Sequence, residues 1–334
     1  TRDALSNFEK ALEYGRKAGD RFVIGCALDV LAYQTMWQST AIDDPDEYLK
    51  CAKKALQYTE EARLQYHPIS FISPRGGGFW VEGPHAHYNY GLSTRQTDLS
   101  KRQGFLEEAV RVAPEELKRA EGSGYPEIIL WAHTMYGCVL TELARIVTNP
   151  EEKRRLLEES LAHMNEADRI SHQVEPLLSW NLGLGGMTRA ATKSGLADIA
   201  RDAQTRVSML EEAAVDMETS LKLCVEDAIV SEREGSVAIS SILGVLECEY
   251  GDVLNRLYVA SQNDKYLLKA IEAFDDAAGA FQKVDLKSRI AECRWKAARI
   301  YDDLGNHLEA AEYFEAASDS YKDAAEKVPK LRDF

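Results

Sequence analysis

Two short motifs carry residue types that could do chemistry. Residues 75–78 (Arg-Gly-Gly-Gly) offer a glycine-rich backbone like those that cradle phosphate, but no Lys-Ser or Lys-Thr pair follows and no strand precedes them. His85 and His87 offer two imidazoles, yet the other histidines are scattered without the spacing of metal ligands. The sequence therefore predicts no nucleotide site, no metal site and no cofactor.

Catalytic constellations are also missing from the sequence. It contains no Gly-x-Ser-x-Gly, no His-Glu-x-x-His and no supported Cys/His pairing. Its carboxylates often stand in pairs at expected helix starts, such as residues 151–152 and 211–212, where they complement the positive end of the helix dipole. We therefore expect a protein that is not an enzyme.

The elements that must position any site are helices that recur in pairs. Apolar residues follow a 3.6-residue period, most clearly from Leu267 through Phe274 to Phe281. About every 50 residues, a Leu followed three positions later by Ala or Ser opens the second helix of a pair. These leucines are Leu49, Leu106, Leu157, Leu210, Leu267 and Leu308.

The first helix of each pair carries a small residue in its interior. These residues are Gly25, Gly91, Gly137, Gly183, Gly244 and Ala298. Glycine inside a helix costs about 1 kcal/mol relative to alanine. Its recurrence therefore predicts a close backbone approach between the paired helices.

Residues 297–317 resemble the tetratricopeptide repeat. The motif runs Ala-Ala-x-x-Tyr-x-x-Leu-Gly-Asn-x-x-Glu-Ala-x-x-Tyr-Phe-x-x-Ala, and residues 179–183 and 87–91 resemble the first helix of that family. The repeats here are longer than the family's period of about 34 residues. The resemblance implies an all-α fold, a right-handed α-solenoid of about six antiparallel helix hairpins that spans residues 1–334 as one domain. Residues 4–18 then form the second helix of a truncated first hairpin.

The resemblance also implies a concave groove lined by the first helices, with ligand contacts at fixed offsets from the small residue. Three aromatic residues, Tyr88, Trp180 and Trp295, share one offset and suit peptide capture. The alternative is that the two tryptophans fill the core between paired helices. The full set of groove positions is Tyr88, Arg95, Gln96, Glu142, Trp180, Thr188, Glu249, Trp295 and Arg299, with Phe22, Asp29, Thr134 and Asp302 at equivalent offsets.

A segment rich in glycine, proline and aromatic residues interrupts the repeats at residues 67–84. Its prolines and its triple glycine exclude a continuous helix. A loop of this length is either functional or disordered. We expect Arg75 and Trp80 to belong to a lid over the groove, with packing of the loop onto its own solenoid as the alternative. Pro114 is expected to kink or split a second helix.

Composition bounds the choice of partner and compartment. Lys and Arg number 40 against 55 Asp and Glu, a net charge of −15, which argues against nucleic acid and anionic membranes and would attract a basic protein or peptide. The six cysteines are far apart, as in reduced cytoplasmic proteins. No apolar run is long enough to span a bilayer. The chain begins at Thr1 in mid-pattern, which suggests a fragment of a longer protein.

The function that we expect is a non-catalytic scaffold or sensor module that binds a protein or peptide in the groove. One alternative is a receptor for a small ligand or signalling peptide, with residues 67–84 as a mobile lid. Another is an α/α-toroid hydrolase, a closed ring of hairpins, but the five tryptophans have no adjoining pair of carboxylates to support it. The sequence indicates no particular oligomeric state.

Overall fold

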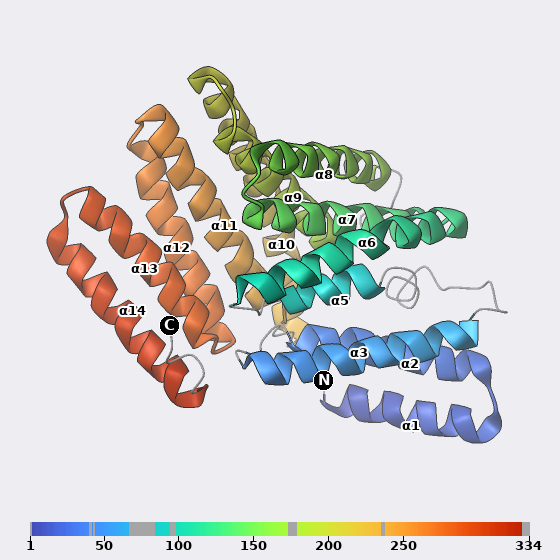
Figure 1. Cartoon of the computed structure of the whole chain (residues 1–334). Coiled ribbons are helices and arrows are strands. Elements are labelled where there is room, and N and C mark those ends of the chain that lie inside the picture. Colours follow the sequence, from blue (N-terminus) through green and yellow to red (C-terminus); the bar gives the residue numbers. More distant parts are fainter. Residues whose placement is uncertain are drawn as a thin grey trace. The chain divides into compact units, whose positions relative to one another are not determined.

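The structure is a computed structural model, and it describes residues 2–39, 42, 44–66, 84–93, 98–172, 179–234 and 238–328. These residues form helices and no strands, which confirms the predicted all-α class. The helices are α1 (Arg2–Ala18), α2 (Arg21–Ser39), α3 (Pro45–Tyr66), α5 (Pro84–Ser93), α6 (Leu99–Ser123), α7 (Pro126–Ile146), α8 (Pro150–Ser171), α9 (Ser179–Asp198), α10 (Ala203–Glu234), α11 (Ala238–Ser261), α12 (Lys265–Lys283), α13 (Lys287–Asp303) and α14 (His307–Lys327) (Figure 1).

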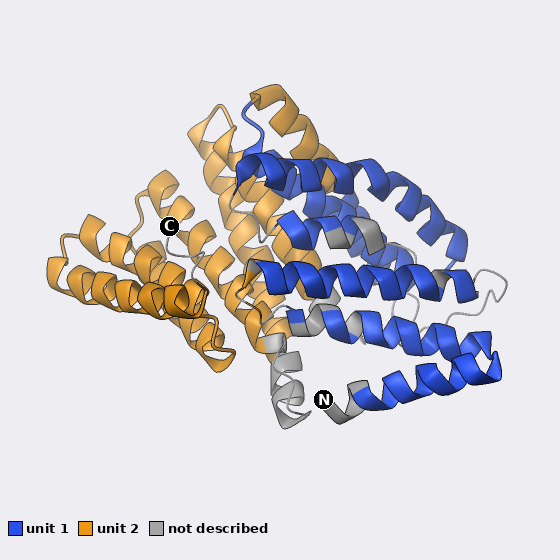
Figure 2. Ribbon diagram, turned by 60° about the horizontal axis from the view of Figure 1, so that its bottom comes forward, with its two compact units in different colours: residues 1–40, 45–148, 162–175 blue, residues 41–44, 149–161, 176–334 orange. Residues whose placement is uncertain are grey.

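The helices belong to two compact units, and the division falls inside α8 (Figure 2). In unit 1, α2 packs on α3 and α5 on α6, while α1 contacts α2 and α7 contacts both α5 and α6. In unit 2, α9 packs on α10, α11 on α12 and α13 on α14, and each pair contacts the next through α10–α11 and α12–α13. Within each unit, the chain is therefore a succession of packed helix pairs. The helix α1 stands where the second helix of a truncated hairpin was expected.

Small residues on the first helices meet the second helices closely, as predicted. A Cβ added at Gly137 would lie 2.3 Å from Met164, and one added at Gly183 would lie 2.3 Å from Cys224 Sγ. At Gly244, the added atom would lie 2.8 Å from the Phe281 ring. A Cβ at these distances would force the facing side chain to shift, so glycine permits the close spacing of these pairs.

The second helices bury the predicted Leu-x-x-Ala/Ser residues in the middle of the chain. Leu106, Leu157, Leu210 and Leu267 are at most 2% exposed. Leu308 departs from the pattern because 81% of it is exposed. Among the described helices, α12 lies between α11 and α13 and buries two faces. The extensive contacts of α14 are with α13, and α14 reaches α12 through the hydrogen bond from Tyr313 to Asp275. The part of α14 that faces α13 instead contains Ala310 and Ala317, two of the residues that carry the family resemblance.

Proline has a different effect at each of two predicted breaks. The helix α6 continues through Pro114, so the predicted split of that helix is wrong. Pro114 is exposed, and α6 is held by α5 and α7, whose packing offsets the cost of about 3 kcal/mol for an interior proline. Pro84 begins α5, a position where its missing N–H costs little. Residues 67–83, including Arg75 and Trp80, lie outside the described residues.

Among the described helices, none combines the length and the apolar character that a membrane crossing requires. Each of the six cysteines lies in the described part of the chain, and none of them forms a disulfide there.

Candidate binding face on helix α13

The helix α13 presents an aromatic residue to solvent. Trp295 is 43% exposed, although its ring is among the largest apolar groups that a protein can bury. One turn later, the Arg299 guanidinium carbon lies 5.2 Å from the centre of the Trp295 ring. At this distance, the cation is attracted to the ring face, which restricts both side chains in water. The structure therefore places Trp295 outside the helix-pair core and next to Arg299, another residue predicted for the groove.

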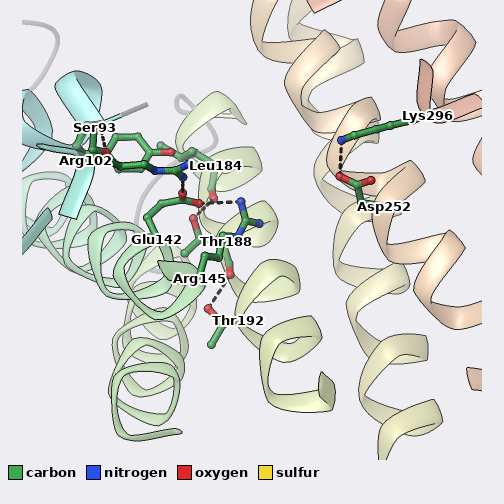
Figure 3. Close-up of polar contacts among 10 residues, drawn as sticks. Ser93, Arg102, Glu142, Arg145, Leu184, Thr188, Thr192, Asp252 and Lys296 are labelled. Atoms are coloured by element: carbon green, nitrogen blue, oxygen red, sulfur yellow. Dashed lines mark hydrogen bonds and ion pairs between the residues drawn. The ribbon is translucent and has the colours of Figure 1, made fainter. Parts of the chain in front are cut away.

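A half-buried lysine joins α13 to α11. The Lys296 Nζ lies 2.7 Å from Asp252 Oδ2, 3.1 Å from Glu292 Oε1 and 3.3 Å from Cys248 Sγ; Figure 3 shows the bond to Asp252. Burial disfavours the ammonium, but its neighbours Cys248, Glu292 and Asp252 outweigh that effect, so the pKa of Lys296 is raised. Lys296 therefore stays charged and fixes the rotation of α13 next to Trp295.

Glycines of α11, phenylalanines of α12 and cations of α13 recur at the same seven-residue interval and pack against one another. Gly251 on α11 leaves room for the Phe274 ring of α12, and Lys296 Nζ lies 5.6 Å from the centre of that ring. One heptad away, Gly244 leaves room for Phe281, and the Arg289 guanidinium carbon lies 5.3 Å from that ring. Each glycine thus admits a phenylalanine, and each phenylalanine supports a cation of α13.

Glu142, a predicted groove residue, is engaged within unit 1. Its carboxylate accepts a hydrogen bond from Arg102 of α6 at 2.7 Å, and Arg145 lies 2.8 Å from its other oxygen (Figure 3). Its side chain is 12% exposed. The arrangement ties α6 to α7 and pairs each carboxylate oxygen with an arginine of unit 1.

Thr188 is also turned inward. It is 3% exposed, and its hydroxyl donates to the Leu184 carbonyl at 2.9 Å (Figure 3). One turn on, Thr192 donates to the Thr188 carbonyl, and its hydroxyl lies 3.0 Å from the hydroxyl of Ser160 on α8. This face of α9 therefore packs against neighbouring helices and offers no binding surface at Thr188.

The remaining predicted positions have varied surroundings. Glu249 is half-buried on α11, and its charge acts on Asp252. Asp302 is exposed and lies 2.9 Å from His307 Nδ1. Phe22 is 44% exposed, whereas Asp29 and Thr134 are fully buried. The positions outside the described residues are Arg75, Trp80, Arg95 and Gln96, together with the side chains of Tyr88 and Trp180.

Sequence reasoning missed two groups that the fold assembles. One is the Lys296–Asp252–Glu292 network, which the shared seven-residue spacing of glycine, phenylalanine and cation could have indicated. The other is His133 and His163, which are 30 positions apart and meet between α7 and α8. Within the described ranges, no three His, Cys, Asp or Glu side chains converge as metal ligands would.

Comparisons with known proteins do not assign the chain to a family. No family description matches the sequence. No curated protein matches it either. A solved structure described as a "Circular tandem repeat protein with novel repeat topology and enhanced subunit contact surfaces" is similar over 99% of this chain and 79% of its own, at 14% identity and a TM-score of 0.32. Another, from "Computational Design of Self-Assembling Cyclic Protein Homooligomers", covers 71% of this chain and 94% of its own, at 16% identity and a TM-score of 0.30. Similarity at this level does not establish a shared fold.

Proposed function

We propose that the protein is a non-catalytic module that binds a protein segment or peptide along the first helices of a tetratricopeptide-like, right-handed solenoid of about six hairpins. The observation that carries the proposal is the exposed Trp295 with Arg299 stacked on it, on a first helix. Tryptophan and arginine are the residue types that most often dominate the energy of protein interfaces. A pair of them left in water is available to a partner.

Preorganisation strengthens the case for this face. Lys296 bonds to Asp252 on α11 and to Glu292 on its own helix, so the rotation of α13 is fixed before any partner arrives. The Arg299 guanidinium already lies over the Trp295 ring. A partner then meets side chains whose freedom is already restricted, which lowers the entropy cost of binding.

The proposed partner is a protein or peptide, with a basic one favoured by the net charge of −15. Such a charge would also repel nucleic acid and anionic lipid. A cytoplasmic setting is part of the proposal because none of the six cysteines, all in the described part of the chain, forms a disulfide.

The test is selection of peptides from a random library on the full chain, followed by calorimetry with the selected peptides. We expect Trp295→Ala to weaken binding by about 30-fold, the effect of losing roughly 2 kcal/mol at an interface hot spot. Arg299→Ala should weaken it to a lesser degree. Leu268→Ala is the matched control because Leu268 is 65% exposed on the second helix α12 of the same unit.

Two results would contradict the proposal. One is a library that yields no peptide with measurable affinity. The other is a folded Trp295→Ala protein that binds every selected peptide as tightly as the Leu268→Ala control does.

A further inference from the structure

Two histidines from successive helices meet in unit 1. His133 lies on α7 and His163 on α8, and their Nδ1 atoms are 2.9 Å apart. The ring of Tyr136, one turn after His133, stacks on His163 with centroids 4.2 Å apart. Two neutral imidazoles at this distance share one proton, because one nitrogen must donate and the other must accept. The two Nδ1 atoms thus face each other across one hydrogen bond, and only the accepting nitrogen presents a lone pair in this tautomer.

We propose that His133 and His163 together bind one divalent transition-metal ion of the class that accepts imidazole nitrogens at right angles, represented by Cu²⁺ and Ni²⁺. Metal–imidazole bonds are about 2.0–2.1 Å long. Two such bonds at 90° place the nitrogens about 2.9 Å apart, whereas a tetrahedral angle needs about 3.3 Å. The observed separation of 2.9 Å fits the right angle without movement of the helices.

The surroundings of the pair disfavour protonation of His133. His133 is 7% exposed, and burial lowers its pKa, so it is neutral near pH 7, as a metal ligand must be. Glu166, one turn after His163 on α8, acts on His133 with its negative charge, and Arg169 acts with the opposite sign. The Glu166 carboxylate is bonded to Arg169, which keeps its pKa below the usual range.

Binding requires only small changes at the two rings. In the neutral pair, the shared proton moves to the outer nitrogen of its own ring, and each imidazole turns its Nδ1 toward the metal about a soft terminal torsion. Water completes the coordination. An extra proton on the pair would have to leave, so affinity should fall as pH drops.

The test is calorimetry with Cu²⁺ and with Ni²⁺ on the full chain at pH 7.5. It uses a background variant in which His85 and His87 are both changed to Ala, because that pair could bind metal by itself. We expect one Cu²⁺ per chain in this background, with paramagnetic resonance showing nitrogen coupling from two imidazoles. His163→Gln and His133→Ala should each lower the affinity by on the order of 100-fold, at least the loss seen when a supporting group is removed. His307→Ala, an exposed histidine of α14, should change nothing.

His133→Ala removes a buried side chain and could unfold the protein. His163→Gln still tests the proposal in that case, because His163 is only partly buried. Glu166→Gln is expected to weaken Cu²⁺ binding several-fold with an unchanged coupling pattern. The proposal is overturned if the background variant binds no Cu²⁺, or if folded His163→Gln protein binds it with unchanged affinity and the same nitrogen coupling.

Discussion

A single buried carboxyl gives the chain a pH dependence that can be worked out at the scale of one residue. Asp29 on α2 is fully buried, and neither of its oxygens has a hydrogen-bond partner among the described residues. Burial raises the pKa of Asp29 well above its ordinary value of 3.8. The folded protein therefore keeps this proton to a higher pH than the unfolded chain does. Stability that is present at low pH is lost as pH rises from about 4 toward the raised pKa.

We predict that this loss has a slope of about 1.4 kcal/mol per pH unit inside that window and disappears in Asp29→Asn. The asparagine is nearly the same size and carries no charge at any pH. Urea unfolding from pH 4 to pH 8 should show wild type losing stability relative to Asp29→Asn as pH rises. Glu9→Gln, an exposed change on α1, serves as the control. A constant difference between wild type and Asp29→Asn would mean that Asp29 ionises equally in both states.

The offset rule of the resemblance selected residues whose surroundings in the structure differ, because the rule encodes neighbours on the same helix and not distant ones. The family offset selected Trp295, and the structure leaves it exposed beside Arg299. The same rule selected Glu142 and Thr188, which are enclosed by contacts that a linear motif does not encode. Arg102 is 40 positions from Glu142, and the face of α9 that carries Thr188 packs on α8 and α10.

At the scale of the helix pair, the glycines of α11 determine how closely α12 can approach. We predict that Gly251→Ala destabilises the protein by about 1–3 kcal/mol, the usual cost of overpacking. A Cβ there would lie 2.7 Å from the Phe274 ring. Gly279→Ala on α12 is the matched control because no atom lies within 4 Å of its added Cβ, and alanine should stabilise that helix by up to about 1 kcal/mol.

Opposite signs for the two substitutions, measured by urea unfolding followed by circular dichroism, would establish that the glycines are needed for close approach. Equal stability of Gly251→Ala and wild type would show instead that Phe274 has room to move aside.

The pairing of helices was predictable because its sequence signals are local. Which face of each helix is buried was not predictable, because burial depends on distant neighbours. Apolar period and recurring small residues sufficed to place the pairs in order. The Leu-x-x-Ala pattern alone does not predict burial, because its leucine is buried at Leu267 of α12 and exposed at Leu308 of α14. Burial of a second helix depends on what packs on each side of it. In the described part of the chain, α12 has extensive contacts with two helices, whereas α14 has them with α13 and reaches α12 through the Tyr313–Asp275 hydrogen bond. Pro114 also depends on neighbouring helices, because the packing of α5 and α7 on α6 allows the helix to continue through an interior proline.

At the scale of the whole molecule, the proposed solenoid and a closed ring of hairpins predict different dimensions in solution. A compact chain of 334 residues has a radius of gyration of about 20 Å. A stack in which each hairpin touches only its neighbours grows in one direction, so its radius must exceed that value. We predict that small-angle X-ray scattering of the full chain gives a radius clearly above about 20 Å and a distance distribution with a long tail. A radius near 20 Å with a symmetric distribution would favour the ring. Because charge repulsion at −15 could also expand the chain, the measurement is repeated in 0.5 M salt, where the solenoid's radius should stay the same.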